Sequence, residues 1–427
     1  MVGSVSPAVV FLTFTPLIYI IGHLVYALYL SPYGRFPGPF WAKLTPLWLT
    51  LQCRRLHRSE VVSNLHKKCG DAVRIGPRHI SIVHPVAMTE VYGHRAGLVN
   101  SPFYDARGGN GSIPAFSSRA LSAFEPHMNH NILAFKNRLQ ALSMNAASSV
   151  NMVVETDYLA FDVIGDFACG QPFGFLKKGY GPFGLVSIID RRGEVLNALG
   201  TMQLALRPWM NYFYVDGFWP SGLRARSGLE HFGRQAFQRR QQEKSGRSDL
   251  LTYLLASVNA RDRQSIPEEE VIAEAISFIV GGSDTTSSTM ATFFDNVARD
   301  QKMQRRLQDE LDEVFVQPLD DNWVAPDAKV SKLVLLQAAL REAMRVRPTS
   351  STGLERLVGK GGKRIAGLWL PEYTIVSVPT YDTMHDAAIF PNPSEFDMDR
   401  WLHPESGQLL EHFVPFSTGH RACIGRK

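Results

Sequence analysis

The residues with the clearest chemical potential surround one cysteine near the C-terminal end of the chain. Residues 416–425 read FSTGHRACIG, so Cys423 lies between Gly419 and Gly425 and follows Arg421 by two positions. Glycines on both sides let the backbone curl tightly, and the curl allows amide N–H groups to point at the sulfur. A nearby arginine adds positive charge, and both effects favour the thiolate form. The pattern therefore predicts a functional cysteine rather than an ordinary loop cysteine.

A second candidate is an acid followed by two alcohols inside a long helical segment that is expected to open with a capping box at Ser265. Residues 281–286 read GGSDTT. Each glycine in a helix interior costs up to ~1 kcal/mol relative to alanine, so the pair requires a compensating role. Either the glycines permit a close helix crossing, or the helix widens locally as a π-bulge-like defect above a bound group.

A third pattern pairs opposite charges on one helix. A helix is predicted from Val330 to Arg347, ended by Pro348. Within it, Glu342 and Arg345 are three residues apart, so their side chains share a face and can pair. Such pairs usually lie on solvated helix faces, so this pattern alone indicates little.

The elements that must position these residues are mainly α-helical, with small antiparallel β-sheets near both ends of the chain. Residues 71–85 alternate apolar and polar side chains on either side of Gly76-Pro77, which predicts a hairpin. A second strand pair is expected from Lys363 to Val378, turning near Pro371. The fold class is therefore α+β, and residues 48–427 form one domain.

Composition excludes several classes of protein. The chain has 427 residues, of which 45% are hydrophobic and 20% charged, so it is neither disordered nor collagen-like. With 45 Lys and Arg against 40 Asp and Glu, the net charge is +5. The basic residues form no long run, so no nucleic-acid partner is expected. The four cysteines lie far apart without a C-x-x-C pair, which excludes a disulfide framework and a structural zinc site.

The N-terminal segment is strongly apolar. No charged side chain precedes Arg35, and Val9 to Leu30 is long enough, at ~1.5 Å per residue, for a bilayer core of ~30 Å. We expect a single transmembrane anchor at residues 1–30 and a Pro-rich hinge at residues 31–47; the alternative is a cleaved signal peptide. Basic residues flank the span and place the body in the cytosol by the positive-inside rule: Arg35, Lys43, Arg54, Arg55 and Arg58.

Together these motifs resemble the cytochrome P-450 superfamily, the heme-thiolate monooxygenases. In that family the string F-x-x-G-x-R-x-C-x-G is the heme-binding loop, so the resemblance implies that Cys423 is the axial ligand of a heme b iron. It implies further cofactor contacts at Phe416, Gly419, Arg421, Gly425, Gly282 and Arg356. Glu342 and Arg345 match the family's E-x-x-R helix, and Arg400 is expected to bridge to Glu342. The segment around Arg400, residues 396–401, matches the family pattern less closely, because Met398 and Asp399 replace the usual Pro and Glu.

The resemblance also implies an activity and its partners. One oxygen atom of O2 would enter a small organic substrate, with electrons from NADPH supplied through an NADPH–cytochrome reductase. Thr285 would hydrogen-bond the bound dioxygen and Asp284 would take part in proton delivery. This acid–alcohol pair favours a monooxygenase over an isomerase or dehydratase. The implied location is the endoplasmic reticulum membrane, with membrane lipid as a partner and the catalytic domain in the cytosol.

Within the superfamily the chain resembles fungal benzoate 4-monooxygenases. The similar motifs are residues 91–94, 103–106, 158–166, 192–195 and 349–354. In the family the last of these lines the substrate pocket, which would place Thr349, Ser350, Ser351, Thr352 and Leu354 there. Their hydroxyls would hold a carboxylate or phenol, or else cap a turn. Tailoring oxygenases of fungal secondary metabolism share much of this pattern, so that activity is an alternative to benzoate hydroxylation.

Two departures from the family pattern bear on heme retention. The printed chain stops at Lys427, where relatives continue into a helix that packs on the heme, and we expect an incomplete heme domain. The segment before Ser117 is shorter than usual and reads GGNG at residues 108–111, which is a poor helix candidate. A non-catalytic, membrane-bound relic without heme is therefore an alternative to the enzyme. In addition, Glu355 replaces the Pro that usually precedes the propionate-binding arginine, here Arg356.

Overall fold

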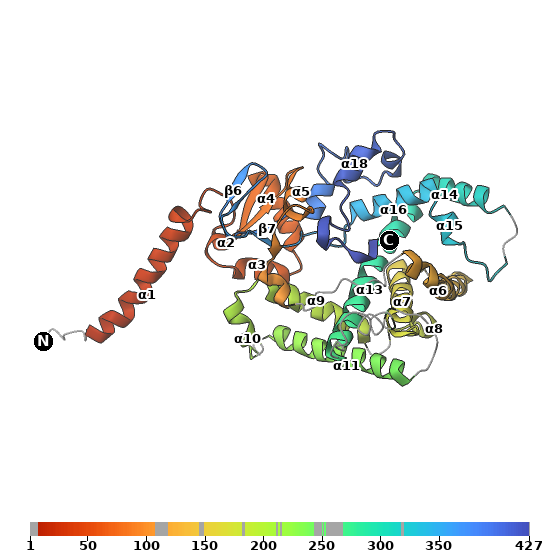
Figure 1. Ribbon diagram of the computed structural model, residues 1–427, viewed down its shortest axis with the longest axis horizontal. Helices are drawn as coiled ribbons and strands as arrows, with labels where there is room; N and C mark the ends of the chain where they lie inside the picture. The colour runs from red at the N-terminus through yellow and green to blue at the C-terminus, as the bar shows by residue number, and fades with distance from the viewer. Residues whose placement is uncertain are drawn as a thin grey trace.

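The structure is a computed structural model, and Figure 1 gives its ribbon. It describes residues 7–426 except 107–117, 145–148, 182–183, 211, 214–215, 243–249, 251, 253–267 and 317–319. Helices dominate the described residues, and short strands form two small sheets. The mainly helical prediction is therefore confirmed. The predicted capping box at Ser265 lies outside the described residues.

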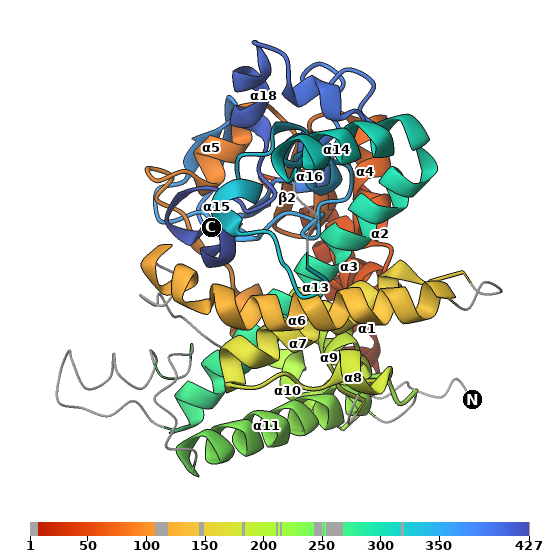
Figure 2. The same cartoon turned by 90° about the vertical axis from the view of Figure 1, so that its right-hand side faces the viewer.

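The helices follow one another along the chain in this order: α1 Pro7–Val25, the π-helix η1 Tyr26–Leu30, α2 Phe40–Leu44, α3 Leu47–Arg54, α4 Arg58–Cys69, α5 Ala87–Tyr92, η2 Pro102–Ala106, α6 Ser118–Met144, α7 Met152–Cys169, α8 Phe175–Lys178, α9 Leu185–Thr201, η5 Leu204–Leu206, α10 Arg207–Met210, α11 Phe218–Gln242, α13 Glu268–Arg299, α14 Gln301–Val314, α15 Asp327–Val330, α16 Val334–Val346, α17 Thr380–Met384, η6 Met398–Trp401, α18 Ser406–His412, η7 Gly419–Arg421 and η8 Ile424–Arg426. The longest of these, α13, contacts α7, α11 and α16, and it runs through the middle of the body in Figure 2.

The larger sheet has the strand order β1-β2-β7-β4-β3, and the smaller pairs β5 with β6. The strands are β1 Ala72–Gly76, β2 His79–Ile82, β3 Val99–Asn100, β4 Arg356–Leu357, β5 Lys363–Ile365, β6 Leu368–Leu370 and β7 Ile375–Ser377. β1 and β2 form the predicted hairpin. The expectation of purely antiparallel sheets is wrong at one pairing, because β2 and β7 are parallel. Parallel strands need a long crossover connection, and here most of the helical body lies between them.

The second predicted strand pair turns at a different place from the one expected. β5 and β6 pair with each other across Ala366 and Gly367, rather than across Pro371. Both turn residues have positive φ, 47° and 75°, a region that glycine enters without strain and that suits a tight hairpin turn. β7 then leaves this hairpin and joins the larger sheet.

The helix α16 begins later than the spacing predicts, at Val334 rather than Val330. Its start is fixed by a tertiary contact, because the carboxylate of Glu310 in α14 accepts hydrogen bonds from the amides of Leu335 and Leu336 at 2.7 and 3.0 Å. Capping of this kind satisfies amide groups that lack partners inside the helix. Residues 327–330 form the separate short helix α15.

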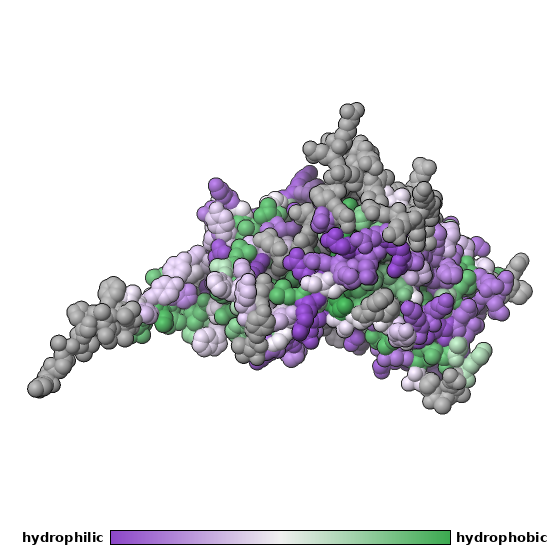
Figure 3. All heavy atoms as spheres, turned by 90° about the horizontal axis from the view of Figure 1, so that it is seen from below, coloured by the Kyte–Doolittle hydropathy of each residue, from purple (hydrophilic) through white to green (hydrophobic). Residues whose placement is uncertain are grey.

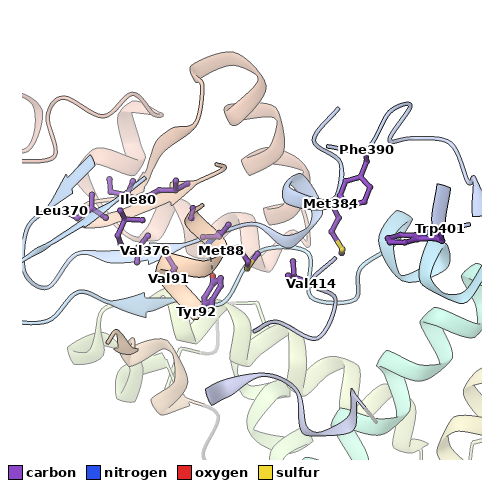
Figure 4. Packing of buried hydrophobic residues seen from close by; sticks show 14 of the residues in the cluster. Ile80, Met88, Val91, Tyr92, Leu370, Val376, Met384, Phe390, Trp401 and Val414 are labelled. Atoms are coloured by element: carbon purple, nitrogen blue, oxygen red, sulfur yellow. Dashed lines mark hydrogen bonds between the residues drawn. The ribbon is translucent and has the colours of Figure 1, made fainter. Parts of the chain in front are cut away.

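Two apolar cores support the elements around residues 416–425, which we call the cysteine loop. One lies between the larger sheet, α5, α16 and η6, and Figure 4 shows its members Tyr92, Val376, Met384 and Trp401 with Val414 at the base of the loop. The other is built by α7, α9, α11 and α13. The cysteine loop and the glycine pair of α13 are therefore each attached to a separate packed core.

The N-terminal helix α1 projects from the body in Figure 1, and η1 follows it. Arg74 fastens this segment to β1, since its guanidinium donates to the carbonyls of Ala27, Lys43 and Pro77 at 2.9–3.1 Å. The side chains of Ile18 and Ile20 are exposed. Among the described residues, no helix combines the length and apolar character that a membrane crossing requires.

Candidate active site

A cavity of about 550 Å³ lies between α13, α16 and the loop at residues 416–425. This volume is typical of sites that bind small molecules or cofactors. The wall of the cavity includes Cys423, Thr285, Gly281 and Tyr92, which come from three different parts of the chain. We call it the cysteine cavity. The fold thus brings the two motifs with the clearest chemistry to one hollow.

The loop around Cys423 is closed by a hydrogen bond of 2.8 Å from the Cys423 amide to the carbonyl of Phe416. The Cys423 side chain is exposed and its thiol is free. Gly425 packs against it, since a Cβ at this glycine would lie 3.8 Å from the Cys423 sulfur. Phe416, Arg421 and Gly425 also line the cysteine cavity. The sulfur is therefore available to a bound group.

Gly419 docks this loop on the end of α5. Its φ is +78°, and a Cβ there would lie 2.0 Å from the carbonyl oxygen of Tyr92. Only glycine fits both the left-handed conformation and this close approach. Gly419 does not line the cysteine cavity but fixes the loop that does.

The two glycines of α13 have different surroundings. A Cβ at Gly281 would meet no atom within 4 Å, whereas one at Gly282 would lie 2.7 Å from Cδ1 of Ile164 in α7. Gly282 therefore permits the close crossing of α13 and α7, and Gly281 leaves open space. The expected π-bulge-like widening is wrong, because α13 is a continuous α-helix through both positions.

The acid–alcohol pair is divided between two sides of α13. Thr285 lines the cysteine cavity, but Asp284 does not. Neighbouring helix residues point about 100° apart, and Asp284 instead lies near Asp157 of α7 and Asp190 of α9. Burial, reinforced by these two carboxylates, raises the pKa of Asp284 to about 6. Asp284 thus exchanges a proton near neutral pH, although its side chain is not on the cavity wall.

The charged residues of α16 form a fully buried network rather than a solvated pair. Glu342 Oε1 accepts from Arg345 Nη2 at 2.7 Å and from Arg400 Nε at 3.0 Å. Glu342 Oε2 accepts from Trp401 Nε1 at 2.9 Å. Asp399, which replaces the usual Glu, pairs with Arg306 on the surface instead. The network ties α16 to η6.

Arg356 is buried behind the cysteine cavity and does not line it. Its guanidinium lies between two tyrosine rings, 5.1 Å from the ring centre of Tyr92 and 5.8 Å from that of Tyr104. Arg356 Nη1 also donates to the Tyr104 hydroxyl at 3.3 Å. The sequence singled out both tyrosines only as part of similar motifs and assigned them no role. The similar motif at residues 91–94, which contains Tyr92, is the signal in the sequence that pointed to this tyrosine.

The segment Thr349–Leu354 separates two hollows. Thr349, Ser350 and Leu354 line the cysteine cavity. All six residues of the segment, Ser351 and Thr352 included, line a second cavity of about 330 Å³. The Ser351 hydroxyl donates to the carbonyl of Pro348 at 2.7 Å, which is the turn-capping role that the sequence left open.

The residues of the cysteine cavity fit a heme. Cys423 offers one free thiol, the ligand type of heme-thiolate proteins. Arg421 lies on the same wall and can balance an anionic side chain of the cofactor. The open space at Gly281 leaves room beside α13 for a bound group. A helical body with a free cysteine across one cavity from a glycine-bearing helix fits the class of heme-thiolate proteins.

The comparisons with known proteins assign the family. The family model for Cytochrome P450 matches residues 37–427, and the chain belongs to this family. It is 33% identical to the benzoate 4-monooxygenase bphA of Aspergillus niger, over 93% of this chain and 86% of that protein. It is 29% identical to the cytochrome P450 monooxygenase ORF9 of Penicillium roqueforti (96% and 82% covered) and 30% identical to the monooxygenase astJ of Aspergillus oryzae (96% and 86%). Membership of this monooxygenase family implies a heme cofactor and electrons from a redox partner.

Proposed function

We propose that this protein is a heme-thiolate monooxygenase that inserts one oxygen atom of O2 into a small organic substrate. The single observation that carries the proposal is the position of Cys423 and Thr285 on the wall of one cavity of about 550 Å³. Cys423 would ligate the iron of heme b, and Arg421 would balance its propionate charge. When bound, the heme supplies the iron chemistry that activates dioxygen. The electrons would come from NADPH through a reductase.

The residues on the α13 side would manage protons. Thr285 Oγ1 donates to the carbonyl of Gly281 at 2.7 Å, so the hydroxyl must turn from this carbonyl before it donates into the cavity. Asp284, whose pKa is raised to about 6, holds or releases a proton close to neutral pH. Because it faces away from the cavity, transfer to Thr285 requires a change of rotamer or a bridging water. A positioned acid of this kind is typical of proton delivery.

The test is the carbon monoxide difference spectrum of the reduced protein, measured on membranes isolated from cells that express it. A red-shifted thiolate band would support the proposal, and aromatic acids and their esters can then be titrated as substrates. A folded protein without this band would contradict the proposal and favour the non-catalytic alternative. Product analysis with benzoate separates 4-hydroxylation, the activity in the name of the Aspergillus niger relative, from a tailoring reaction on another substrate.

We also propose that residues 1–30 attach the protein to the endoplasmic reticulum membrane with the body in the cytosol. Exposed apolar side chains on α1, such as Ile18, Ile20 and Ile21, support the proposal. Further exposed apolar residues on the body, Trp41 and Trp209, suit contact with lipid, and Figure 3 shows apolar surface where the N-terminal helix meets the body. When membranes are washed at high pH, the wild-type protein should stay in the membrane pellet, whereas the variant with all three isoleucines replaced by Asp should be released. Retention of the variant in the pellet would contradict this role.

A further inference from the structure

Two exposed histidines meet where the cysteine loop contacts the end of α5. His94 follows Gly93, the C-terminal cap of α5, and His420 follows Gly419 in η7. Their ring centres are 4.6 Å apart, and the ring planes are inclined at 88°. Both side chains are exposed, and neither lines the cysteine cavity. His94 is the last residue of the motif at residues 91–94, and the chemistry described above gives it no role.

The backbone holds the two histidines beside each other. α5 contacts η7, and the docking of Gly419 on the Tyr92 carbonyl leaves only 2.0 Å for a Cβ at this glycine. The amide of Gly93 donates to the carbonyl of Thr89 at 2.9 Å, which closes the end of α5. A ligand that bridges the two rings therefore joins groups that are already near each other, and ordering them costs little conformational entropy.

The imidazole nitrogens of this pair are not used by the fold. Among the described residues, neither ring has a hydrogen-bond or ion-pair partner. The buried histidines differ in this respect, because His66 and His79 hydrogen-bond serine hydroxyls at 2.8 and 2.9 Å. A neutral imidazole nitrogen with a free lone pair is the most common metal ligand in proteins. His94 and His420 thus offer two such ligands at one point of the surface.

The separation of the two rings fits a pair of ligands on one metal ion. A bond from zinc to a histidine nitrogen is about 2.0–2.1 Å long, which places each ring centre about 3.2 Å from the ion. At bond angles between about 90° and 109°, the centres of two such rings lie about 4.5–5.2 Å apart. The observed 4.6 Å falls in this range. Exposed side chains change rotamer within nanoseconds, so each ring can turn one nitrogen towards a common point.

The chemistry of the pair also selects the kind of ion. Imidazole suits Zn²⁺ and Cu²⁺, whereas Mg²⁺ and Ca²⁺ prefer oxygen ligands. In the part of the chain that the structure describes, no group of three or more His, Cys, Asp or Glu side chains could hold a metal, so water would complete the coordination. The exposed Arg95 and Arg421 adjoin the histidines in sequence. Their charge further disfavours ions held by electrostatic attraction alone, although solvent and salt screen it.

We propose that His94 and His420 bind one Zn²⁺ or Cu²⁺ ion, and that the bound ion fastens the cysteine loop to the end of α5. With water in the remaining positions, the ion exchanges with solvent, unlike one enclosed by four protein ligands. The inference goes beyond the proposed monooxygenase function and does not rest on it, because neither histidine lines the cysteine cavity.

Zn²⁺ alone is the probe for the test. The full chain is treated with a chelator and then titrated with zinc chloride at pH 7.5 by isothermal titration calorimetry. The wild-type protein should bind one ion whose affinity falls at least tenfold in His94→Ala and in His420→Ala, since even the loss of an outer partner of a metal ligand costs 10–100-fold. Absence of zinc binding, the wild-type affinity in either variant, or equally tight binding of Mg²⁺ overturns the proposal.

Two control variants separate this site from other zinc ligands of the chain. Cys423→Ala removes the exposed thiol of the cysteine loop, and His403→Ala removes an exposed histidine outside the pair. Both variants should retain the ion whose affinity depends on His94. Loss of that ion in Cys423→Ala would assign it to the thiol and overturn the proposal. All four substitutions are at exposed side chains, where effects on folding are small.

Hydrogen exchange tests whether the ion fastens the loop. Zn²⁺ should slow the exchange of the amides at residues 419–423 and 93–96 in the wild-type and His403→Ala proteins, because a ligand that joins two segments opposes their local opening. The same amides should be unaffected by Zn²⁺ in His94→Ala and His420→Ala. Bound zinc without this protection overturns the fastening. None of these measurements needs a heme signal, so a missing thiolate band contradicts the proposed function and leaves the zinc site standing.

Discussion

Thr285 Oγ1 donates a hydrogen bond of 2.7 Å to the carbonyl oxygen of Gly281, one turn earlier in α13. The bond holds the only hydroxyl proton of this side chain on its own helix, on the wall of the cysteine cavity. The Thr285 hydroxyl therefore lies at the cavity, and rotation about χ1 or the C–O bond would let it donate a hydrogen bond to a group in the cavity. Thr285 thus lies on the cavity wall while α13 remains a regular helix.

The first prediction concerns this hydroxyl. Thr285→Ala should lower product formed per NADPH consumed by roughly tenfold to a hundredfold and release hydrogen peroxide instead, because the proton donor at the cavity is lost. Thr285→Ser keeps the hydroxyl and should keep most of the coupling. Product and peroxide are measured together in both variants. Tight coupling in the alanine variant would contradict the role of Thr285.

The second prediction follows from the raised pKa of Asp284, about 6. In the folded protein this carboxyl binds its proton more tightly than in the unfolded chain, so its ionisation destabilises the fold as pH rises from about 4 through 6. Asp284→Asn removes this cost and should stabilise the protein at pH 7.5 by on the order of 1 kcal/mol, a value reduced for partial solvent screening. At pH 4 the two proteins should be equally stable. Urea unfolding at both pH values checks this, and a stability gain of equal size at pH 4 would exclude the titration as its cause.

The third prediction concerns Glu342, whose side chain is 0% exposed and pairs with Arg345 and Arg400. Glu342→Gln leaves buried guanidinium charge without a counter-charge and should cost about 3–5 kcal/mol in free energy of unfolding. The matched control is Asp399→Asn, which breaks the surface pair with Arg306, whose side chains are 35% and 51% exposed. That loss should stay below about 1 kcal/mol. Similar losses in the two variants would show that burial does not decide the strength of these pairs.

Local patterns in the sequence were sufficient for the features that depend on neighbouring residues. The β1–β2 hairpin follows the turn at Gly76-Pro77, and the cysteine loop follows its glycines. The spacing of Glu342 and Arg345 predicts that they share a helix face, but only the family resemblance singled the pair out, and neither predicted its complete burial. The resemblance supplied the rest of the site as a set of expected positions.

Features that depend on distant residues were not predictable from the sequence. Arg58 and Glu355 form a buried ion pair although they are 297 positions apart, and no local pattern relates them. The start of α16 was misplaced because its cap comes from Glu310 of α14 rather than from its own sequence. Asp284 and Thr285 were treated as one unit, although consecutive helix residues face different directions and only Thr285 reaches the cavity. Of the two alternatives for the glycine pair, the close helix crossing is the one observed, at Gly282 against Ile164, and the helix is not widened there.

The fourth prediction concerns the docking of the cysteine loop. Gly419→Ala places a methyl group 2.0 Å from the carbonyl oxygen of Tyr92, at a φ of +78°, so the loop must move. The left-handed conformation alone costs about 1–2 kcal/mol for a residue with a Cβ, and the collision adds to it. The variant should lose heme more readily, measured as heme bound per protein after gel filtration. Gly407→Ala in α18 is the control, because nothing lies within 4 Å of the new Cβ, and its heme content should equal that of the wild-type protein.

The fifth prediction separates a ligand cysteine from a structural one. Cys423 is exposed, so Cys423→Ala should change the free energy of unfolding by no more than about 0.5 kcal/mol and yet abolish the thiolate band in the reduced carbon monoxide spectrum. Cys169→Ala removes a buried thiol from the core of α7, so it should reduce stability by about 1 kcal/mol and leave the band in place. Loss of the band in Cys169→Ala, together with its survival in Cys423→Ala, would show that Cys169 and not Cys423 is the thiolate ligand. A band that survives in both variants would remove Cys423 from the site, because the thiol on the cavity wall would then have no part in binding the heme.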